Sequence, residues 1–458
     1  MVGSLLKQRD RFRLALSSID CTVGELLGTG GQGEVYEVWP EAAGRSGEPF
    51  AFKCYFPANA TKEQWQSLST LIDMGAPDER FLWPSDLAEL PEVQTFGYLM
   101  ALREARFAGL ADLVRRSVTT SFRGIAIAGF QLADSFLALH SRGLCYRDIS
   151  LGNVFFDPRT GDISICDNDN VAVDGQGHES VLGTTGFLAP EVERLEAKPS
   201  AETDLYSLSV LLFLLCINHH PLLGARELRF PSLDQAAYAS LYGRDPVFIF
   251  DPNDASNRPV PGSHDNATIL WPLYPSFVRD HFTRAFTEGL HRPGARVRES
   301  TWKGAMARLR DLIVRCGCGA EVFFDVELGT VAGDPPGRCW SCGGEPTIPP
   351  RLTVNGRTTV LNDGMDLSGH HVGARLYDYD TVAASVVRHP ADPRIRGLKN
   401  RSSQTWEAIE ADGATHHVAP DRSVRLLEGL RVRFPDADGQ ITISTDEDAD
   451  RGRNEPRW

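Results

Sequence analysis

Apolar and polar positions divide the chain into segments of different periodicity. Residues 1–20 are predicted to form a short helical lead-in. Residues 21–103 contain short alternating runs that predict strands, with one helical segment near 60–74. From 104 to 315 apolar residues recur at three- and four-residue spacing, as in GIAIAGFQLADSFLALHSRG and STWKGAMARLRDLIVR, which predicts helices. Residues 349–444 return to short alternating runs broken by Gly, Asp and Pro, and predict a small all-β domain.

Composition and charge narrow the class of protein. The 458 residues are 42% hydrophobic and 24% charged, which is ordinary for a globular protein of several domains. A net charge of −14 argues against a protein held mainly by nucleic acid or an anionic membrane. The start lacks the apolar core of a signal peptide, and the longest apolar run, LYSLSVLLFLLCI, is too short to cross a bilayer. A cytoplasmic protein is expected, with a polar, disordered tail over 445–458.

Four of the nine cysteines are clustered in a Gly/Cys/Pro-rich segment, residues 316–348. Cys316 and Cys318 form C-x-C, and Cys339 and Cys342 form C-x-x-C twenty residues later. Two close pairs of soft ligands suit tetrahedral Zn²⁺, so a structural zinc ribbon is predicted. A redox pair, or four unrelated thiols, are the alternatives.

A glycine motif lies near the N-terminus, in LLGTGGQGEVYEV. Gly28, Gly30 and Gly33 give G-x-G-x-x-G, with Val35 two places later. The motif stands between two strand-like runs, so it predicts a hairpin whose backbone N–H groups approach nucleotide phosphates. A glycine-rich turn without a ligand explains the same residues. Lys53, in the strand-like FAFKCYF, is then a candidate for contact with the α- and β-phosphates rather than an ordinary exposed strand residue.

Further motifs follow in order along the chain. The stretch ICDNDN alone would be read as a polar turn, because Asp and Asn side chains bond the local backbone. It comes after YRDISLGN and before GTTGFLAPE and ETDLYSLSVLLF. In this order and spacing the set resembles the eukaryotic-like (Hanks-type) Ser/Thr protein kinases, over roughly residues 20–315.

The resemblance implies an α+β, bilobal protein-kinase fold with an N-lobe over 21–103 and a C-lobe over 104–315. Asp148 would accept or orient the proton of the substrate hydroxyl. Asn153 and Asp167 would hold Mg²⁺ (or Mn²⁺) against the phosphates of ATP, and Lys53 would steady the α- and β-phosphates.

The resemblance also assigns the rest of the nucleotide site. The stretch GYLMALR would be the hinge, with Leu99 near the gatekeeper position and Met100 to Leu102 offering backbone groups to adenine. The nucleotide-contacting residues are then Gly28, Gly30, Gly33, Val35, Lys53, Met100 and Leu102. Glu191 would pair with Arg298, and Asp204 would also be structural. Thr184 would orient Asp148, which favours a protein Ser/Thr substrate over a small molecule.

Several positions depart from the kinase pattern. Tyr146 replaces the usual His, and Ser150 replaces a Lys whose charge lies near the γ-phosphate. Asn168 and Asp169 replace the Phe and Gly of Asp-Phe-Gly. A bond between Tyr146 and Asn168 is expected, as is a loop that keeps Asp167 turned toward the phosphates. The acid that pairs with Lys53 is left open, since Glu63 lies early in its helix and Asp73 lies late.

The all-β domain allows two folds. Gly356-Arg357, Ser368-x-x-His371 and GLKN at 397–400 resemble a forkhead-associated (FHA) phosphothreonine-binding sandwich, with Arg357 or Arg401 to grip the phosphate. An OB-like barrel is the alternative. Acidic and basic residues roughly balance in this domain, so nucleic-acid binding has no electrostatic support.

The order kinase, zinc ribbon and β domain resembles stand-alone bacterial kinases that work beside a PP2C-type phosphatase and a von Willebrand A-domain protein. The function implied is an Mg-ATP-dependent kinase that phosphorylates Ser/Thr of itself and of partner proteins. The alternative is a nucleotide-binding pseudokinase scaffold that recruits partners through its zinc ribbon and β domain. A small-molecule kinase is a third hypothesis.

Overall fold

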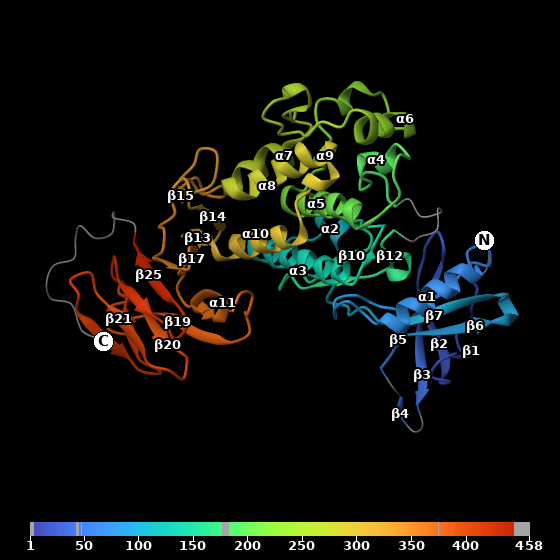
Figure 1. Cartoon of the computed structure of the whole chain (residues 1–458), viewed down its shortest axis with the longest axis horizontal. Helices are drawn as coiled ribbons and strands as arrows, with labels where there is room; N and C mark the ends of the chain where they lie inside the picture. Colours follow the sequence, from blue (N-terminus) through green and yellow to red (C-terminus); the bar gives the residue numbers. More distant parts are fainter. Residues whose placement is uncertain (1–3, 43–44, 47, 176–182, 374, 444–458) are drawn as a thin grey trace. The chain divides into compact units, whose positions relative to one another are not determined.

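The computed structural model describes residues 4–42, 45–46, 48–175, 183–373 and 375–443 (Figure 1). The tail predicted to be disordered, 445–458, lies outside these residues. The chain divides into two compact units. The first comprises Met1–Thr120, Ile127–Ala267 and His281–Lys303; the second comprises Ser121–Ala126, Thr268–Asp280 and Gly304–Trp458.

An antiparallel sheet begins the first unit, with strand order β1-β2-β3-β5-β7-β6 and β4 paired to β3. Its strands are β1 (Arg11–Arg13), β2 (Asp20–Thr29), β3 (Gly33–Ala42), β4 (Arg45–Ser46), β5 (Phe50–Tyr55), β6 (Asp86–Leu90) and β7 (Thr95–Ala101). The predicted helical lead-in is wrong, because Arg11–Arg13 pair with β2 as an edge strand. The short alternation of RFR, with Phe12 buried between two exposed arginines, has the period of a strand.

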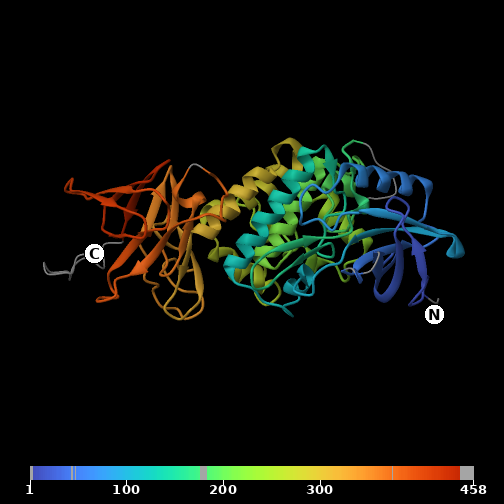
Figure 2. The same ribbon diagram turned by 90° about the horizontal axis from the view of Figure 1, so that it is seen from below.

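Helix α1 (Lys62–Met74) lies along this sheet in both views of the ribbon (Figures 1 and 2). Thr61 caps its N-terminus by accepting a hydrogen bond from the backbone N–H of Gln64. Leu68 is fully buried and belongs to one apolar cluster with Tyr55 and Tyr98 of the sheet. The helix therefore has a fixed place against the sheet, and its first turn lies near Tyr55.

Helices and short strands follow along the chain as far as residue 311. The strands are β8 (Ala108–Gly109), β9 (Leu144–Cys145), β10 (Val154–Phe156), β11 (Ile163–Ile165) and β12 (Ala172–Val173). The helices that follow along the chain are α2 (Leu110–Val114), α3 (Phe122–Ser141), α4 (Pro190–Glu193), α5 (Ala201–Ile217), α6 (Gln235–Tyr238), α7 (Asp265–Leu270), α8 (Ser276–Phe286), α9 (Glu288–His291) and α10 (Glu299–Asp311). Turns of 3₁₀ or π type lie between them at Asn168–Asn170, Glu227–Arg229, Ala239–Arg244, Ala255–Asn257, Trp271–Leu273 and Pro293–Ala295, and a further 3₁₀ turn, Pro91–Val93, lies between β6 and β7.

Two apolar helices form the centre of this helical lobe. Helix α5 opens with a capping box between Ser200 and Thr203, and its residues from Thr203 to Ile217 are buried. Helix α3 is long and apolar enough to cross a membrane by length and composition. Its Leu132, Phe136 and Leu139 are fully buried, as expected for the core helix of a folded lobe.

The second unit contains a small sheet and a β-sandwich. The small sheet is β13 (Ile313–Arg315), β14 (Glu321–Asp325) and β15 (Thr330–Val331). One sandwich sheet has the order β17-β16-β25-β24-β21-β22 and the other β18-β19-β20-β23. Their bounds are β16 (Arg351–Val354), β17 (Arg357–Val360), β18 (Asp366–Ser368), β19 (Val382–Arg388), β20 (Arg396–Asn400), β21 (Trp406–Ile409), β22 (Thr415–Val418), β23 (Ser423–Arg425), β24 (Arg431–Arg433) and β25 (Asp438–Thr442), with helix α11 (Gly369–Val372) after β18.

One apolar core joins the two sheets of the sandwich. It includes Leu352 and Trp406 from the six-stranded sheet and Val386 and Leu398 from the four-stranded sheet. Two antiparallel sheets packed over a shared core form a sandwich, whereas an OB-fold is a single five-stranded barrel. The tail therefore has the two sheets of a sandwich, and its likeness to an FHA domain in particular stays a prediction.

Candidate nucleotide and metal sites

The glycine motif forms the turn between β2 and β3. The backbone N–H of Gly30 donates to the carbonyl of Gly33 at 2.9 Å and closes the turn. A Cβ on Gly33 would lie 2.1 Å from the carbonyl oxygen of Cys54, so packing of the sheet requires glycine there. A Cβ on Gly28 would meet no described atom within 4 Å. The fold therefore does not require glycine at position 28, and open space beside the hairpin backbone suits an approaching ligand.

Substitution of these two glycines should have different effects. We expect Gly33→Ala to destabilise the first unit by about 1–3 kcal/mol through overpacking, whereas Gly28→Ala should leave stability within about 0.5 kcal/mol and weaken ATP binding. Thermal unfolding and a nucleotide titration of both variants measure the two effects. Equal loss of stability in the two variants, with equal affinity for ATP, would contradict this account of the hairpin.

Lys53 lies on β5 between two carboxylates. Its Nζ is 2.6 Å from Oδ1 of Asp167 and 2.8 Å from Oδ2 of Asp169, and it donates to Oε1 of Gln32 at 3.3 Å. Burial alone would lower the pKa of Lys53, but the two carboxylates outweigh it and raise the pKa above its usual value. Lys53 is therefore held as a cation.

The acid partner of Lys53 differs from both sequence candidates. In the described part of the chain the partners are Asp167 and Asp169, whereas Glu63 and Asp73 are exposed. Asp169 occupies the position where kinases usually have glycine. The residue that departs from the kinase pattern is therefore itself an acid partner of Lys53.

Asp148 lies in the loop between β9 and β10. Its Oδ1 accepts a hydrogen bond from Oγ1 of Thr184 at 2.7 Å, as the sequence predicts. The side-chain amide of Asn153 donates to the backbone carbonyl of Asp148 at 2.8 Å and to its Oδ2 at 3.4 Å. Burial raises the pKa of Asp148, and these hydrogen bonds partly offset that shift. The carboxylate is therefore oriented and half-buried, as a group that must accept a proton should be.

Asp204 anchors the backbone of the same loop. Its carboxylate accepts hydrogen bonds from the backbone N–H groups of Tyr146 and Arg147. His140 bridges Asp204, at 3.2 Å from its Nε2, to Glu299 on its other ring nitrogen. Burial alone would lower the pKa of His140, but the bonds to the two acids raise it to about 9. Asp204 is thus structural, as the sequence predicts.

The shifted pKa of His140 predicts how stability depends on pH. His140 is protonated in both folded and unfolded chains below pH 6.5, so its stabilising contribution is fully present there. As the pH rises through the folded value of about 9, that contribution is lost. We expect the unfolding free energy of the first unit to fall by on the order of 1–3 kcal/mol over this window.

Urea unfolding followed by tryptophan fluorescence at pH 6, 7.5 and 9 measures this loss. His140→Gln should flatten the pH dependence, whereas His417→Gln, at an exposed histidine of the second unit, should leave it unchanged. An equal slope in His140→Gln and the unaltered chain would refute the assignment.

The ICDNDN loop turns at Asp167, whose φ of 57° and ψ of 43° lie in the left-handed region. Aspartate tolerates this region better than most residues. The turn directs the Asp167 carboxylate toward Lys53. The expected bond between Tyr146 and Asn168 is wrong. Tyr146 donates to the carbonyl of Cys166, and Asn168 donates to the carbonyls of Leu82 and Ile165 at 2.9 and 3.1 Å. Each side chain satisfies a backbone carbonyl instead.

The hinge prediction needs a one-residue correction. Tyr98 and Met100 on β7 pair with Lys53 and Ala51 on β5, so all four side chains share one face of the sheet. Ala51, Tyr98 and Met100 belong to one apolar cluster, and Val35 and Leu102 pack against it. Leu99 lies in the cluster on the opposite face. Met100, and not Leu99, therefore faces the side of the sheet that carries Lys53.

The prediction that Glu191 pairs with Arg298 is also wrong, because the partner is Arg296, two residues earlier in the chain. Arg296, which is 4% exposed, donates to Glu191 at 2.8 Å. Arg298 is exposed, just before α10 begins at Glu299. Arg296 is almost fully buried and needs an acid partner, and the half-buried carboxylate of Glu191 provides it.

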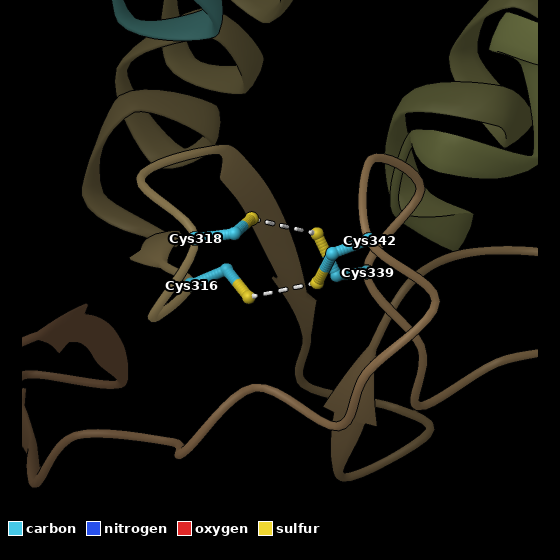
Figure 3. Close-up of side chains that lie close together, drawn as sticks. All are labelled: Cys316, Cys318, Cys339 and Cys342. Carbon is cyan, nitrogen blue, oxygen red and sulfur yellow. Dashed lines mark hydrogen bonds between the residues drawn. The ribbon is translucent and has the colours of Figure 1, made fainter.

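The four clustered cysteines come together in the second unit (Figure 3). Their sulfur atoms all lie within 4.8 Å of one another. The Sγ atoms of Cys316 and Cys342 are 3.7 Å apart, and those of Cys318 and Cys339 are 3.8 Å apart. Sulfurs at about 2.3 Å from a tetrahedral Zn²⁺ are separated by about 3.8 Å. The four thiols therefore fit this ion without rearrangement.

The residues that suggested an FHA-like fold make contacts within the second unit. Ser368 and His371 are buried; Ser368 caps α11, and His371 binds Asp311 at 3.2 Å. Arg357 donates to the carbonyls of His370 and Gly373. One nitrogen of the Arg357 guanidinium is therefore engaged with backbone, and its role in gripping a phosphate stays a prediction. Arg401, 42% exposed in its side chain, donates to the Ser385 hydroxyl and lies 3.5 Å from Asp421, and it stays the other predicted phosphate ligand.

A glycine hairpin beside a buried lysine, an anchored Asp148 loop and an Asp167 turned toward the lysine form the arrangement that the resemblance to protein kinases predicts. The comparisons with known proteins agree. Residues 21–238 match the family described as the protein kinase domain. The matched segment contains Lys53, Asp148, Asn153 and Asp167.

Similar curated proteins are Ser/Thr kinases. The probable serine/threonine-protein kinase CCRP1 of Zea mays is 29% identical over 205 residues, which is 43% of this chain and 31% of the relative. The cell cycle serine/threonine-protein kinase CDC5/MSD2 of Saccharomyces cerevisiae is 29% identical over 215 residues, 43% of this chain and 28% of the relative. The serine/threonine-protein kinase plk-2 of Caenorhabditis elegans is 26% identical over 170 residues, 34% of this chain and 24% of the relative. The chain thus covers less than a third of the length of these relatives. All three relatives are named as serine/threonine-protein kinases.

Proposed function

We propose that this chain is an Mg-ATP-dependent protein kinase that phosphorylates serine or threonine of itself and of partner proteins. The observation that carries the proposal is the pair of oriented acids in the first unit. Asp167 lies 2.6 Å from the Nζ of Lys53, and Asp148 accepts the Thr184 hydroxyl at 2.7 Å. Phosphoryl transfer needs one acid for the metal, a cation for the phosphates and one acid for the attacking hydroxyl.

The donor set fits a divalent magnesium ion. Carboxylate and amide oxygens are the hard ligands that Mg²⁺ prefers, and Asp167 and Asn153 offer them. Burial and the neighbouring charge of Asp169 raise the pKa of Asp167, and a cation at this carboxylate would relieve that crowding. Asp167 is 35% exposed in its side chain, so it is open to an incoming ion. Bound Mg²⁺ would neutralise charge on the ATP phosphates.

The roles of the chain's own groups follow from their positions. The backbone of the Gly28–Gly33 hairpin would approach the phosphates, and Lys53 would hold the α- and β-phosphates. Val35, Met100 and Leu102 offer an apolar face for adenine. Asp148, oriented by Thr184, would accept the hydroxyl proton as the oxygen attacks.

The pseudokinase alternative has one specific observation in its favour. Ser150 takes the place of a lysine and is 6% exposed, so it brings no cation toward the γ-phosphate. Stabilisation of transferring phosphate by cations is a large part of catalysis, so this change would slow transfer. We favour the kinase because Lys53, Asp148, Asn153 and Asp167 are all present and gathered in one unit.

The second unit contributes a zinc ribbon and a recruitment module in this proposal. The cysteine cluster would hold a structural Zn²⁺, and the sandwich would bind partners in the manner of an FHA-like domain, with Arg401 as its exposed cation. A PP2C-type phosphatase and a von Willebrand A-domain protein, in the bacterial cytoplasm, remain the partners that the domain order predicts.

Peptide arrays test the substrate class. Incubation with Mg-ATP and arrays of Ser-, Thr- or Tyr-containing peptides should place phosphate on Ser or Thr. Phosphate found only on tyrosine, or only on small alcohols, would contradict the proposal.

A further inference from the structure

A buried acid in the loop after Asp167 holds Lys53. The Asp169 side chain is fully buried, with Oδ2 at 2.8 Å from the Nζ of Lys53. An isolated buried carboxylate is costly, so Asp169 and Lys53 depend on each other for charge compensation.

Helix α1 reaches the same place with a neutral side chain. Nε2 of Gln64 donates to the hydroxyl of Tyr55 at 3.1 Å and to the backbone carbonyl of Asp169 at 3.2 Å. The Tyr55 hydroxyl in turn donates to Oδ2 of Asp169. The Tyr55 hydroxyl therefore links the Gln64 amide to the carboxylate that pairs with Lys53.

The two acids beside Lys53 differ in access. Asp167 is 35% exposed in its side chain and Asp169 is not exposed at all. Only Asp167 can therefore meet a metal ion that enters from solvent. The Asp169 carboxylate contacts Lys53 and Tyr55 and no solvent, so it is placed to hold the amine of Lys53.

We propose that Asp169 is the positioning residue for Lys53, in place of the acid that protein kinases carry on the helix corresponding to α1. This inference rests on the proposed function. In kinases the helix acid must move into place before the lysine is aligned, and regulation acts on that movement. Here the acid belongs to the loop that also carries Asp167, and α1 contributes an amide. Displacement of α1 would remove hydrogen bonds between neutral groups at Tyr55 and Gln64 while leaving the Lys53 ion pair in place.

The first test needs no catalysis. Removal of the Asp169 carboxylate should free the amine of Lys53 from one of its two acid partners, so that the amine reacts faster with an acylating reagent. We expect Asp169→Asn to raise the labelling rate of Lys53 at pH 8, followed by mass spectrometry without nucleotide, at least about fivefold. Glu63→Gln should leave that rate unchanged. Acceleration by Glu63→Gln, or none by Asp169→Asn, would overturn the inference whether or not the chain is a kinase.

The second test moves the charge back to the helix. Asp169→Gly should lower kcat at least about tenfold, and adding Gln64→Glu should restore kcat to within about threefold of the unaltered chain and protect Lys53 from labelling again. A double variant as impaired as Asp169→Gly alone in both readouts would overturn the inference. If Asp169→Gly fails to fold, Asp169→Asn with Gln64→Glu provides the same comparison, because asparagine keeps the shape. A chain that transfers no phosphate in any form would defeat the proposed function, while the labelling rates would still decide the role of Asp169.

Discussion

Asp148→Asn should reduce phosphate transfer by at least about 10³-fold. The amide keeps the shape of the carboxylate, and its oxygen can still accept the Thr184 hydroxyl, so the loop should stay folded. It cannot accept the proton of the attacking hydroxyl. Binding of Mg-ATP should change little, because Lys53 and Asp167 are untouched. Initial rates with radiolabelled ATP, together with a nucleotide titration, separate the two effects.

A matched control uses an acid of the same lobe that does not contact Lys53, Asp148 or Asp167. Asp162 lies in a surface ion pair with Arg106, and its replacement by asparagine should leave the rate unchanged. Asp148→Asn with undiminished transfer would eliminate Asp148 as the proton acceptor. Equal loss in both variants would point to a general effect on folding rather than on the reaction.

Replacement of a cysteine ligand should have the largest effect on the second unit. We expect the unaltered chain to carry about one zinc per molecule and Cys339→Ser to carry none. Zinc binding contributes on the order of 10 kcal/mol to the folding of small metal domains, so the segment around the cysteines should unfold. The sheets of the first unit have their own core and should remain folded.

Metal analysis and amide hydrogen exchange measure this result. In Cys339→Ser the backbone of 313–345 should lose protection, while the β5 and β7 strands keep theirs. Cys21→Ala, at a buried cysteine outside the cluster, is the control and should keep its zinc. A chain without zinc whose four thiols react freely, and whose cysteine segment stays protected, would refute the ribbon.

Local sequence patterns predict which elements carry many of the candidate site residues. The hairpin of Gly28 to Gly33 follows from glycines between two strand-like runs, and Lys53 follows in the next strand. Asp148 and Asn153 are close because only four residues separate them, and a hydrogen bond joins their side chains. The cysteine cluster also follows from spacing, since two short pairs need only one hairpin to meet.

The features that the sequence does not predict depend on contacts between residues far apart in the chain, or on which face of a strand or helix a residue occupies. The Asp169 contact joins residues 116 positions apart, and no spacing rule reaches across two lobes. The polar Tyr55 hydroxyl at the end of an apolar strand was the one available signal, since a buried tyrosine needs a partner. Leu99 and Arg298 were misassigned by one and two residues, because strand parity and the start of α10 decide which side chain is buried.

In the tail domain too, the sequence pattern predicts the strands but not how their side chains pack. Alternating runs predict a β domain, but they do not reveal which arginines face solvent. Arg357 and His371 match an FHA-like motif in spacing, yet the fold uses them to bind carbonyls and Asp311. Motif spacing alone therefore cannot identify a phosphate site here.

The most direct test of the account is transfer of γ-labelled phosphate by the unaltered full-length chain in Mg²⁺ or Mn²⁺. We predict label on the chain itself, with acid hydrolysis releasing phosphoserine or phosphothreonine. Asp167→Ala should abolish both this label and metal-dependent ATP binding. Tight metal-dependent ATP binding with no label on the chain or on any Ser/Thr peptide would contradict the kinase and leave the nucleotide-binding scaffold as the function.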